Sequence, residues 1–186
     1  MAATYTVKYA TGSDGSPTWN ALPGSGGTAF RFKTNTDVAV NLSDPIPIPS
    51  SGFNYSYWVS LTLDLGGTFT QVDNIRHYCD GGIGWNTGTG GGLFINTNPT
   101  GLADADYEQS QGTSGTSGDE CAANHGGVTT MSSIASYTSG SPLTVDSTAY
   151  TSTGNTKHIV LQVKVADDAT QGVQSSETLT WLADEI

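Results

Sequence analysis

Apolar residues recur at every second position through most of this chain. The alternation is clearest over residues 59–65, where valine and leucine occupy the odd positions, and over 159–165, where isoleucine, leucine and valine do the same. A period of two puts successive side chains on opposite faces of a β-strand, whereas an amphipathic helix requires a period of 3.6. Glycine makes up 24 of the 186 residues and only 12% are charged, which suits short strands joined by turns. The sequence therefore predicts an all-β fold.

Further segments extend this prediction to a whole domain. Residues 4–9, 68–79, 91–97 and 175–186 resemble strands, and 28–33 and 37–42 alternate around a polar turn, which predicts a hairpin. Residues 10–27 are typical of turns, with Trp19 and Leu22 as anchors, and prolines 45, 47 and 49 predict an edge strand or an extended connector. We expect a single antiparallel β-sandwich over residues 1–186, jelly-roll or immunoglobulin-like, of about eight strands with long loops rich in glycine, serine and threonine.

The two best-patterned segments are expected to pair or stack in the core. In the first, Trp58 falls on the face opposite the leucines, so we expect a half-buried strand with that face outward. In the second, His158 and Lys164 fall on the outward face and are expected to be solvated. Residues 101–150 lose the alternation, which predicts a long loop insertion of the kind that is usually functional or disordered.

The charge balance argues against one class of partner. The formal net charge is −11, from 17 acidic and 6 basic residues, and no lysine or arginine occurs between His77 and Thr156. Nucleic-acid binding requires a basic face that displaces counterions, so we expect no nucleic-acid partner. No apolar run approaches the ~20 residues of a membrane helix, so we expect no membrane partner. The first residues lack the features of a signal peptide, so we expect the chain to remain in the cell that makes it or to leave by lysis or another unencoded route.

Catalytic and metal-binding motifs are missing from the sequence. Nothing matches G-x-S-x-G, H-E-x-x-H or a P-loop, so we expect no enzymatic activity and no cofactor. Residues 104–108 resemble the start of a calcium loop, but Gln109 and Gly115 stand where an EF-hand needs glycine and glutamate. A solvated acidic loop is the expectation, and an irregular calcium site stays open as an alternative, with ligands drawn from Asp80, Asp104, Asp106, Asp119 and Glu120.

The two cysteines leave three alternatives open. Cys79 and Cys121 lie far apart in the sequence, each in glycine-rich surroundings. They could be two partly buried thiols, because free cysteine is commonly buried. They could instead form a disulfide that closes the intervening loop. A zinc site with His77 and His125 is the third alternative, although the spacing matches no known ligand pattern.

The segment "CDGGIGWNTGTGGG", residues 79–92, has an unusual composition. Seven of its fourteen residues are glycine, so its backbone can turn tightly and lie close to another surface. Trp85 stands in the middle. One interpretation folds this ring back onto the core, because tryptophan is usually largely buried. The other makes it an anchor on a partner protein or a platform for a sugar.

Two stretches resemble structural proteins of tailed-phage virions. Within residues 44–88 the segments are "DPIPIPSSGFNYSYWVSLTLDLGG" and "NIRHYCDGG", and within 158–186 they are "HIVLQVKVADDATQG" and "TLTWLADEI". The resemblance implies an immunoglobulin-like or jelly-roll module on the virion, of the head decoration (cement) type, with no catalytic residues. It also implies the major capsid protein and neighbouring copies of the chain as partners, in a homo-oligomer such as a trimer, on particles assembled in the host cytoplasm. The long cysteine-containing loop departs from this pattern.

A decoration protein needs sheet edges, loops and apolar anchors that can contact neighbours. The expected contact residues are apolar or aromatic side chains of the proline-rich edge, the following strand and the glycine-rich loop: Ile46, Ile48, Tyr55, Tyr57, Trp58 and Trp85. The alternative function is a carbohydrate-binding β-sandwich of a phage fibre or surface protein. In that case Trp58 or Trp85 would stack on the sugar.

Overall fold

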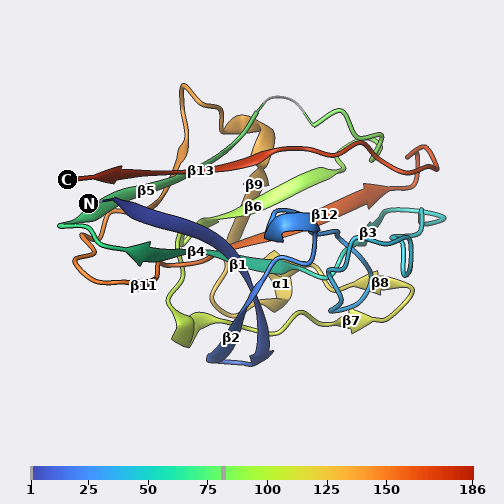
Figure 1. Cartoon of the computed structure of the whole chain (residues 1–186). Coiled ribbons are helices and arrows are strands. Elements are labelled where there is room, and N and C mark those ends of the chain that lie inside the picture. The colour runs from blue at the N-terminus through green and yellow to red at the C-terminus, as the bar shows by residue number, and fades with distance from the viewer. Residues whose placement is uncertain (1, 81–82) are drawn as a thin grey trace.

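The computed structural model describes residues 2–80 and 83–186, and strands dominate their regular structure. Ten strands form one sheet, in the order β2-β1-β4-β12-β3-β8-β7, with β11 beside β4, β6 beside β12 and β9 beside β6; three strands form a second sheet, β10-β5-β13. The two sheets face each other as a β-sandwich (Figure 1), which confirms the all-β prediction. The strands are β1 Ala3–Ser13, β2 Ser16–Ala21, β3 Phe53–Tyr55, β4 Val59–Gly67, β5 Val72–Cys79, β6 Gly92–Asn98, β7 Gly112–Thr113, β8 Ser117–Gly118, β9 Thr130–Ser133, β10 Leu143–Asp146, β11 Gly154–Asn155, β12 Ile159–Ala166 and β13 Leu179–Glu185.

The strand number exceeds the expected eight because several strands are very short. Thirteen strands occur in the described residues, and β3, β7, β8 and β11 have three residues or fewer. Helical structure is limited to α1, Cys121–Asn124, and to single 3₁₀ turns at Ser25–Gly27, Asp104–Asp106 and Ile134–Ser136. Within residues 2–80 and 83–186, no helix has the length and apolar character needed to cross a bilayer.

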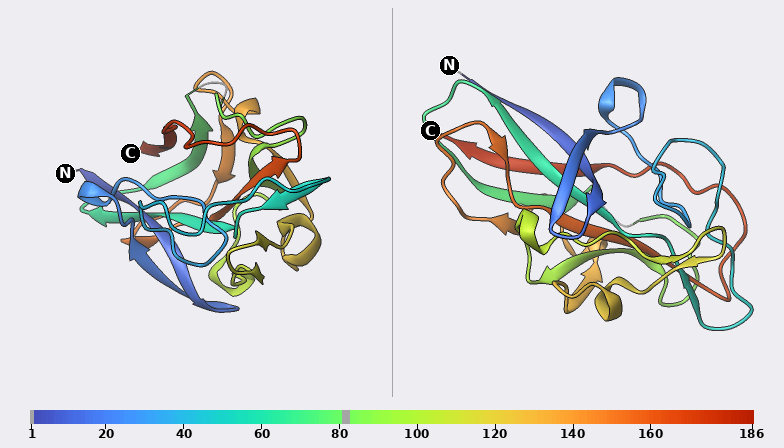
Figure 2. Two further views of the ribbon diagram at one scale, coloured as in Figure 1. Left: turned by 90° about the vertical axis from the view of Figure 1, so that its right-hand side faces the viewer. Right: turned by 90° about the horizontal axis from the view of Figure 1, so that it is seen from below.

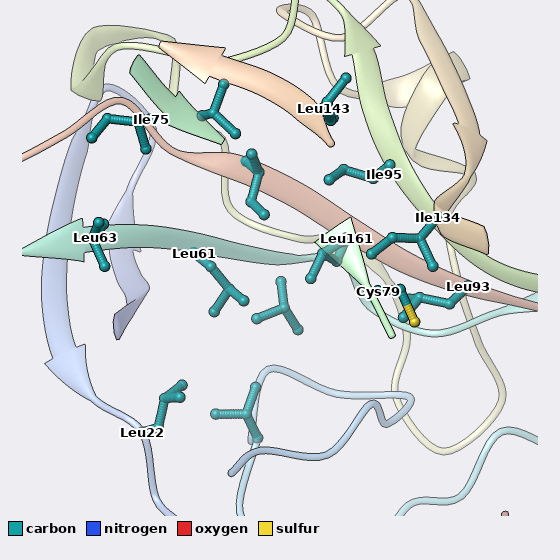
Figure 3. Close-up of a cluster of buried hydrophobic side chains, with 14 of the residues drawn as sticks. Leu22, Leu61, Leu63, Ile75, Cys79, Leu93, Ile95, Ile134, Leu143 and Leu161 are labelled. Atoms are coloured by element: carbon teal, nitrogen blue, oxygen red, sulfur yellow. The ribbon is translucent and has the colours of Figure 1, made fainter. Parts of the chain in front are cut away.

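The main core fills the space between the two sheets. The alternating residues of β4 and β12 face inward, and Ile159 of β12 lies opposite Leu61 of β4 in the ladder. Figure 3 shows leucines of these two strands in one cluster with side chains of β5 and β10, and it labels Leu61, Leu63, Leu161, Ile75, Cys79 and Leu143. Each fully buried leucine or isoleucine contributes about 1.5–3 kcal/mol relative to exposure. The prediction that 158–165 and 58–65 lie together in the core is confirmed by their direct pairing.

The N-terminal segment forms a longer hairpin than its composition indicated. β1 and β2 pair antiparallel, and the two residues between them are Asp14 and Gly15. Gly15 has a φ of +69°, a conformation that glycine adopts without steric cost. The prediction of turns throughout residues 10–27 was therefore wrong for β2, although Leu22 is buried as expected.

The predicted hairpin over residues 28–42 does not form strands. Arg31 donates its backbone N–H to the carbonyl of Val38, but no ladder follows. The segment is organised instead by the buried ammonium of Lys33, which donates to Asp37 at 2.5 Å, Asn41 at 2.8 Å and Ser43 at 3.2 Å. These polar side chains replace a ladder, which is why the alternation of apolar residues misled the prediction. The proline-rich residues 45–49 form an extended connector, one of the two expected alternatives.

A bulge between β3 and β4 redirects the chain along β12. Tyr55 lies opposite Lys164 and Val59 opposite Leu161, so the β3–β4 side has one extra residue. Ser56 fills the gap, because its backbone N–H donates to Val163 and its Oγ accepts from the Val163 N–H, both at 2.9 Å. Bulges of this kind re-aim the neighbouring side chains.

Residues 101–133 cover the face of β4 and β12 that points away from β5 and β13 (Figures 1 and 2). Leu102 exchanges two backbone hydrogen bonds with His158, at 2.8 and 2.9 Å. Gln162 donates to the carbonyls of Ser56 and Asp119 and accepts from the N–H of Cys121. The prediction of a half-buried β4 was therefore wrong. The expected loop of residues 101–150 instead contains four strands, β7 to β10, and the short helix α1.

Candidate functional site

Most of the large apolar side chains that stay exposed belong to one half of the molecule. Figures 1 and 2 show both termini at one end, while residues 37–53 and the connection from β12 to β13 lie in the other half. Within the described residues, five of the seven large exposed apolar side chains are in these two segments: Val40, Leu42, Ile48, Phe53 and Val173. We call this half the loop half. Isolated exposed apolar residues are ordinary, but a concentration of them marks an interaction surface.

The six expected contact residues differ in how far they are exposed. Ile48 is 37% exposed and lies in the loop half, as the contact hypothesis requires. Ile46 and Tyr55 are half-buried, Ile46 against the main core. Burial raises the pKa of Tyr55 to about 12, with the Glu120 carboxylate adding to the shift. Tyr57 and Trp58 are buried, so the expectation that they contact a partner was wrong.

Residues 101–133, which cover this face of the sheet, explain why Trp58 is buried. Its indole Nε1 donates to the carbonyl of Glu108 at 3.0 Å, and its backbone N–H donates to Ser110 Oγ at 2.7 Å. Both partners belong to residues 101–133. The ring therefore lies between the sheet and its cover rather than at the surface.

Trp85 anchors the glycine-rich loop on the chain's own return segment. It is half-buried against the main core, and its Nε1 donates to the carbonyl of Ser175 at 2.7 Å. The next residue, Asn86, donates its backbone N–H to Gln174 Oε1 at 3.0 Å. The interpretation in which the ring folds back is thus the one that fits the structure. Residues 81–82 of this loop lie outside the described residues.

Phe53 forms the structured centre of the loop half. The ammonium of Lys164 lies 3.8 Å from the centroid of its ring, a cation–π contact. Asp168 holds the neighbouring loop by accepting from the N–H and the hydroxyl of Thr89 at 2.7 and 2.6 Å. The first contact holds Phe53, and the second holds the loop of Thr89. Lys164 is half-buried over the ring rather than freely solvated, which corrects the expectation for that residue.

His158 is buried, so the expectation of a solvated histidine was wrong. Its ring centroid lies 5.5 Å from that of Trp19 and 6.3 Å from that of Tyr107. Neither ring nitrogen has a hydrogen-bond partner within the described residues. Burial, together with nearby His125, lowers the pKa of His158 to about 4.

His125 lies in the same cover, with its ring centroid 5.7 Å from that of Trp58. Its Nδ1 accepts the N–H of Gly127 at 3.1 Å. Burial lowers the pKa of His125, while the carboxylates of Glu108, Asp106 and Asp14 oppose the shift. The pair of histidines is held neutral at physiological pH, which suits a structural position better than proton transfer.

The two cysteines are not bonded to each other. Cys79 lies in the main core between the sheets, whereas Cys121 lies in the second apolar cluster beneath the cover, with Trp58 and Val160. Burial raises the pKa of the Cys121 thiol far above its usual range. The disulfide alternative was therefore wrong, and buried thiols fit instead.

The expected metal ligands do not converge. In the part of the chain that the structure describes, no three histidine, cysteine or acidic side chains come together as a metal-binding group. Asp104 accepts from the indole of Trp19 at 3.2 Å, and Asp106 accepts from the N–H of Ala103 at 3.2 Å. His77 lies in the other sheet, against Trp181, and is not beside His125. The calcium and zinc alternatives were therefore both wrong.

Comparison with protein-family models, with curated proteins and with solved structures finds no match for this chain. The function is therefore argued from the residues and the geometry above.

Proposed function

We propose that this chain is a non-enzymatic structural protein of a virion, a decoration protein that binds the outer surface of a phage head through its loop half. The observation that carries the proposal is the concentration of exposed apolar side chains there, on segments held by Lys33, Lys164 and Asp168. A contact surface of this kind loses little conformational entropy when it binds, because its scaffold is already ordered. The resemblance of residues 44–88 and 158–186 to virion proteins supports the choice of partner.

The composition agrees with binding to a large assembly. Repetition of one modest contact over a symmetric shell gives stable attachment without a strong individual interaction. The net charge of −11 favours solubility of the unbound chain. The proposed partners are the major capsid protein and, on the shell, neighbouring copies of the chain, with a trimer as the favoured oligomer.

The carbohydrate-binding alternative has lost the residues that suggested it. Trp58 is 4% exposed and Trp85 gives its indole N–H to the chain itself. Phe53, the aromatic ring exposed in the loop half, carries Lys164 on one side. A sugar platform needs an open ring face. Trp58 is buried, Trp85 is packed against the main core, and Lys164 occupies one face of Phe53.

Co-sedimentation with purified phage heads tests the proposal. Leu42 is 66% exposed in the loop half, and Ile186 is 72% exposed at the opposite end, so the two residues form a matched pair. We expect Leu42→Asp to weaken binding about tenfold or more, as expected for an anchor of about 1.4 kcal/mol, and Ile186→Asp to bind like the wild type. Equal binding by both variants would show that the loop half is not part of the interface.

A further inference from the structure

The smaller sheet has three strands, against ten in the larger sheet. β13 is its edge strand, and among the described residues it forms its ladder with β5 alone. Beside β13, Tyr5 and Val7 of β1 and the buried Leu63 of β4 line one side of a hollow. Tyr5 is 43% exposed.

These residues line a groove of about 440 Å³ between the sheets. Its other wall is β13 itself, from Leu179 to Ala183, all half-buried. The groove is mainly apolar and lies beside a row of backbone groups on the outer side of β13. An edge strand with unpaired N–H and C=O groups next to an apolar surface is a template for another strand.

The termini end of this groove is negatively charged. Glu185 accepts from the N–H of Ala3 at 2.9 Å and from the hydroxyl of Tyr5 at 3.4 Å, and both donors are neutral. Its neighbour Asp184 pairs with Arg76. Within the described residues, four of the six basic side chains are in ion pairs with carboxylates: Lys8, Lys33, Arg76 and Lys157. None of these carboxylates is Glu185, so in that part of the chain Glu185 is available to a basic partner.

We propose that the groove between β1 and β13 accepts an extended, apolar strand with lysine or arginine at its end, supplied by another protein. The strand pairs with β13 as a fourth strand of the smaller sheet. Its inward side chains cover Tyr5 and Val7, and its basic end meets Glu185. A second copy of this chain is disfavoured, because pairing β13 with itself brings together two chains of net charge −11 without new cations.

This acceptor groove is separate from the loop half and does not depend on it. Figure 1 shows β1 and β13 running to the end that carries both termini, away from residues 37–53. Head binding can therefore fail while the groove works, and the reverse also holds.

The test uses the full chain and two labelled peptides, Lys-Val-Thr-Val-Thr-Val-Thr-Val-Lys and the same peptide with glutamate at both ends. Fluorescence anisotropy measures binding, and hydrogen exchange locates it. We expect the lysine peptide to bind and to protect the amides of residues 179–185. The glutamate peptide should bind more weakly, and Glu185→Gln should weaken the lysine peptide about two- to fivefold, the range of an exposed ion pair.

Two groove variants and one control separate the outcomes. Ala183→Phe fills the groove and should weaken the lysine peptide about tenfold or more, while Ala149→Phe, at an exposed position elsewhere, should leave binding unchanged. Tyr5→Ala removes a side chain that lines the groove and should also weaken the lysine peptide. Because Tyr5 is exposed, this variant should still fold if Ala183→Phe does not. Absence of binding, or binding that neither groove variant alters, overturns the proposal. It is also overturned if the wild type is a dimer that Ala183→Phe dissociates, because the occupant is then a second copy.

Discussion

The ring of Trp19, in the N-terminal hairpin, lies 5.5 Å from the ring of His158, on the face of β12 that points away from the main core. Tyr107 of the cover completes the enclosure of that histidine. Three distant parts of the chain therefore converge on one neutral imidazole. This arrangement makes the second face of the larger sheet as much a part of the interior as the first.

Acid should destabilise the fold between pH 6.5 and 4. Burial lowers the pKa of His158 to about 4 and that of His77 to about 3, whereas an unfolded histidine titrates near 6.5. The unfolded state then binds more protons in this window, so the free energy of unfolding falls as pH falls, by up to about 1.4 kcal/mol per pH unit for each such histidine. Urea unfolding at pH 7, 6 and 5 measures the slope.

A variant assigns part of that slope to one residue. His158→Phe keeps an aromatic ring beside Trp19 but takes up no proton, so its pH slope should be smaller by about one proton, or about 1.4 kcal/mol per pH unit. A wild-type stability that stays flat from pH 7 to pH 5 contradicts the account.

Gln162 should hold the cover on the sheet. Its amide bonds three backbone groups, of Ser56, Asp119 and Cys121, at 2.7–2.9 Å. Gln162→Ala leaves these buried groups without that partner and should cost about 3 kcal/mol in the free energy of unfolding, since each such group costs about 1–3 kcal/mol. Gln109→Ala, at an exposed position, is the control and should change stability by less than about 0.5 kcal/mol.

Replacing Lys33 should lower the free energy of unfolding far more than replacing a surface lysine. Its side chain is fully buried and is bonded by Asp37, Asn41 and Ser43, whereas Lys8 pairs with Asp64 at the surface with about a quarter of each side chain exposed. We expect Lys33→Met to cost about 3 kcal/mol and Lys8→Met less than about 1 kcal/mol. Thermal unfolding of both variants measures the difference, and equal losses would refute the structural role of Lys33.

The Cys121 thiol should be unreactive in the folded protein. It is 0% exposed, and burial together with Glu108 and Glu120 raises its pKa, so little thiolate forms near neutral pH. Iodoacetamide should leave Cys121 unmodified in buffer and alkylate it in urea, as peptide mass spectrometry can show. The intact mass should also be the same before and after reductant. Rapid alkylation in buffer would contradict the buried position.

The strand positions could be predicted where burial on one face alone decides the pattern. Residues 59–65 and 159–165 alternate because their inner faces meet the same core, and the structure pairs them directly. The outer face was predicted wrongly because polar residues there, such as Gln162 and His158, are buried by a segment with little apolar periodicity. That segment is held by side-chain bonds to the backbone, which leave no period in the sequence.

The candidate site was only partly predictable for a similar reason. Ile48 is exposed, as a contact residue must be, because a proline-rich connector cannot enter a sheet interior; its contact with a partner stays a prediction. Tyr57 and Trp58 were misplaced because residues of the 101–133 segment cover them, with Gly112 beside the Tyr57 ring and Glu108 and Ser110 bonded to Trp58.

The most direct test of the proposed function is an electron cryomicroscopy reconstruction of phage heads incubated with the protein. The account predicts ordered density on the outer shell, with Leu42, Ile48 and Phe53 facing the capsid and both termini directed away from it. Bare shells at saturating protein, or density in which the termini end contacts the capsid instead, would contradict it.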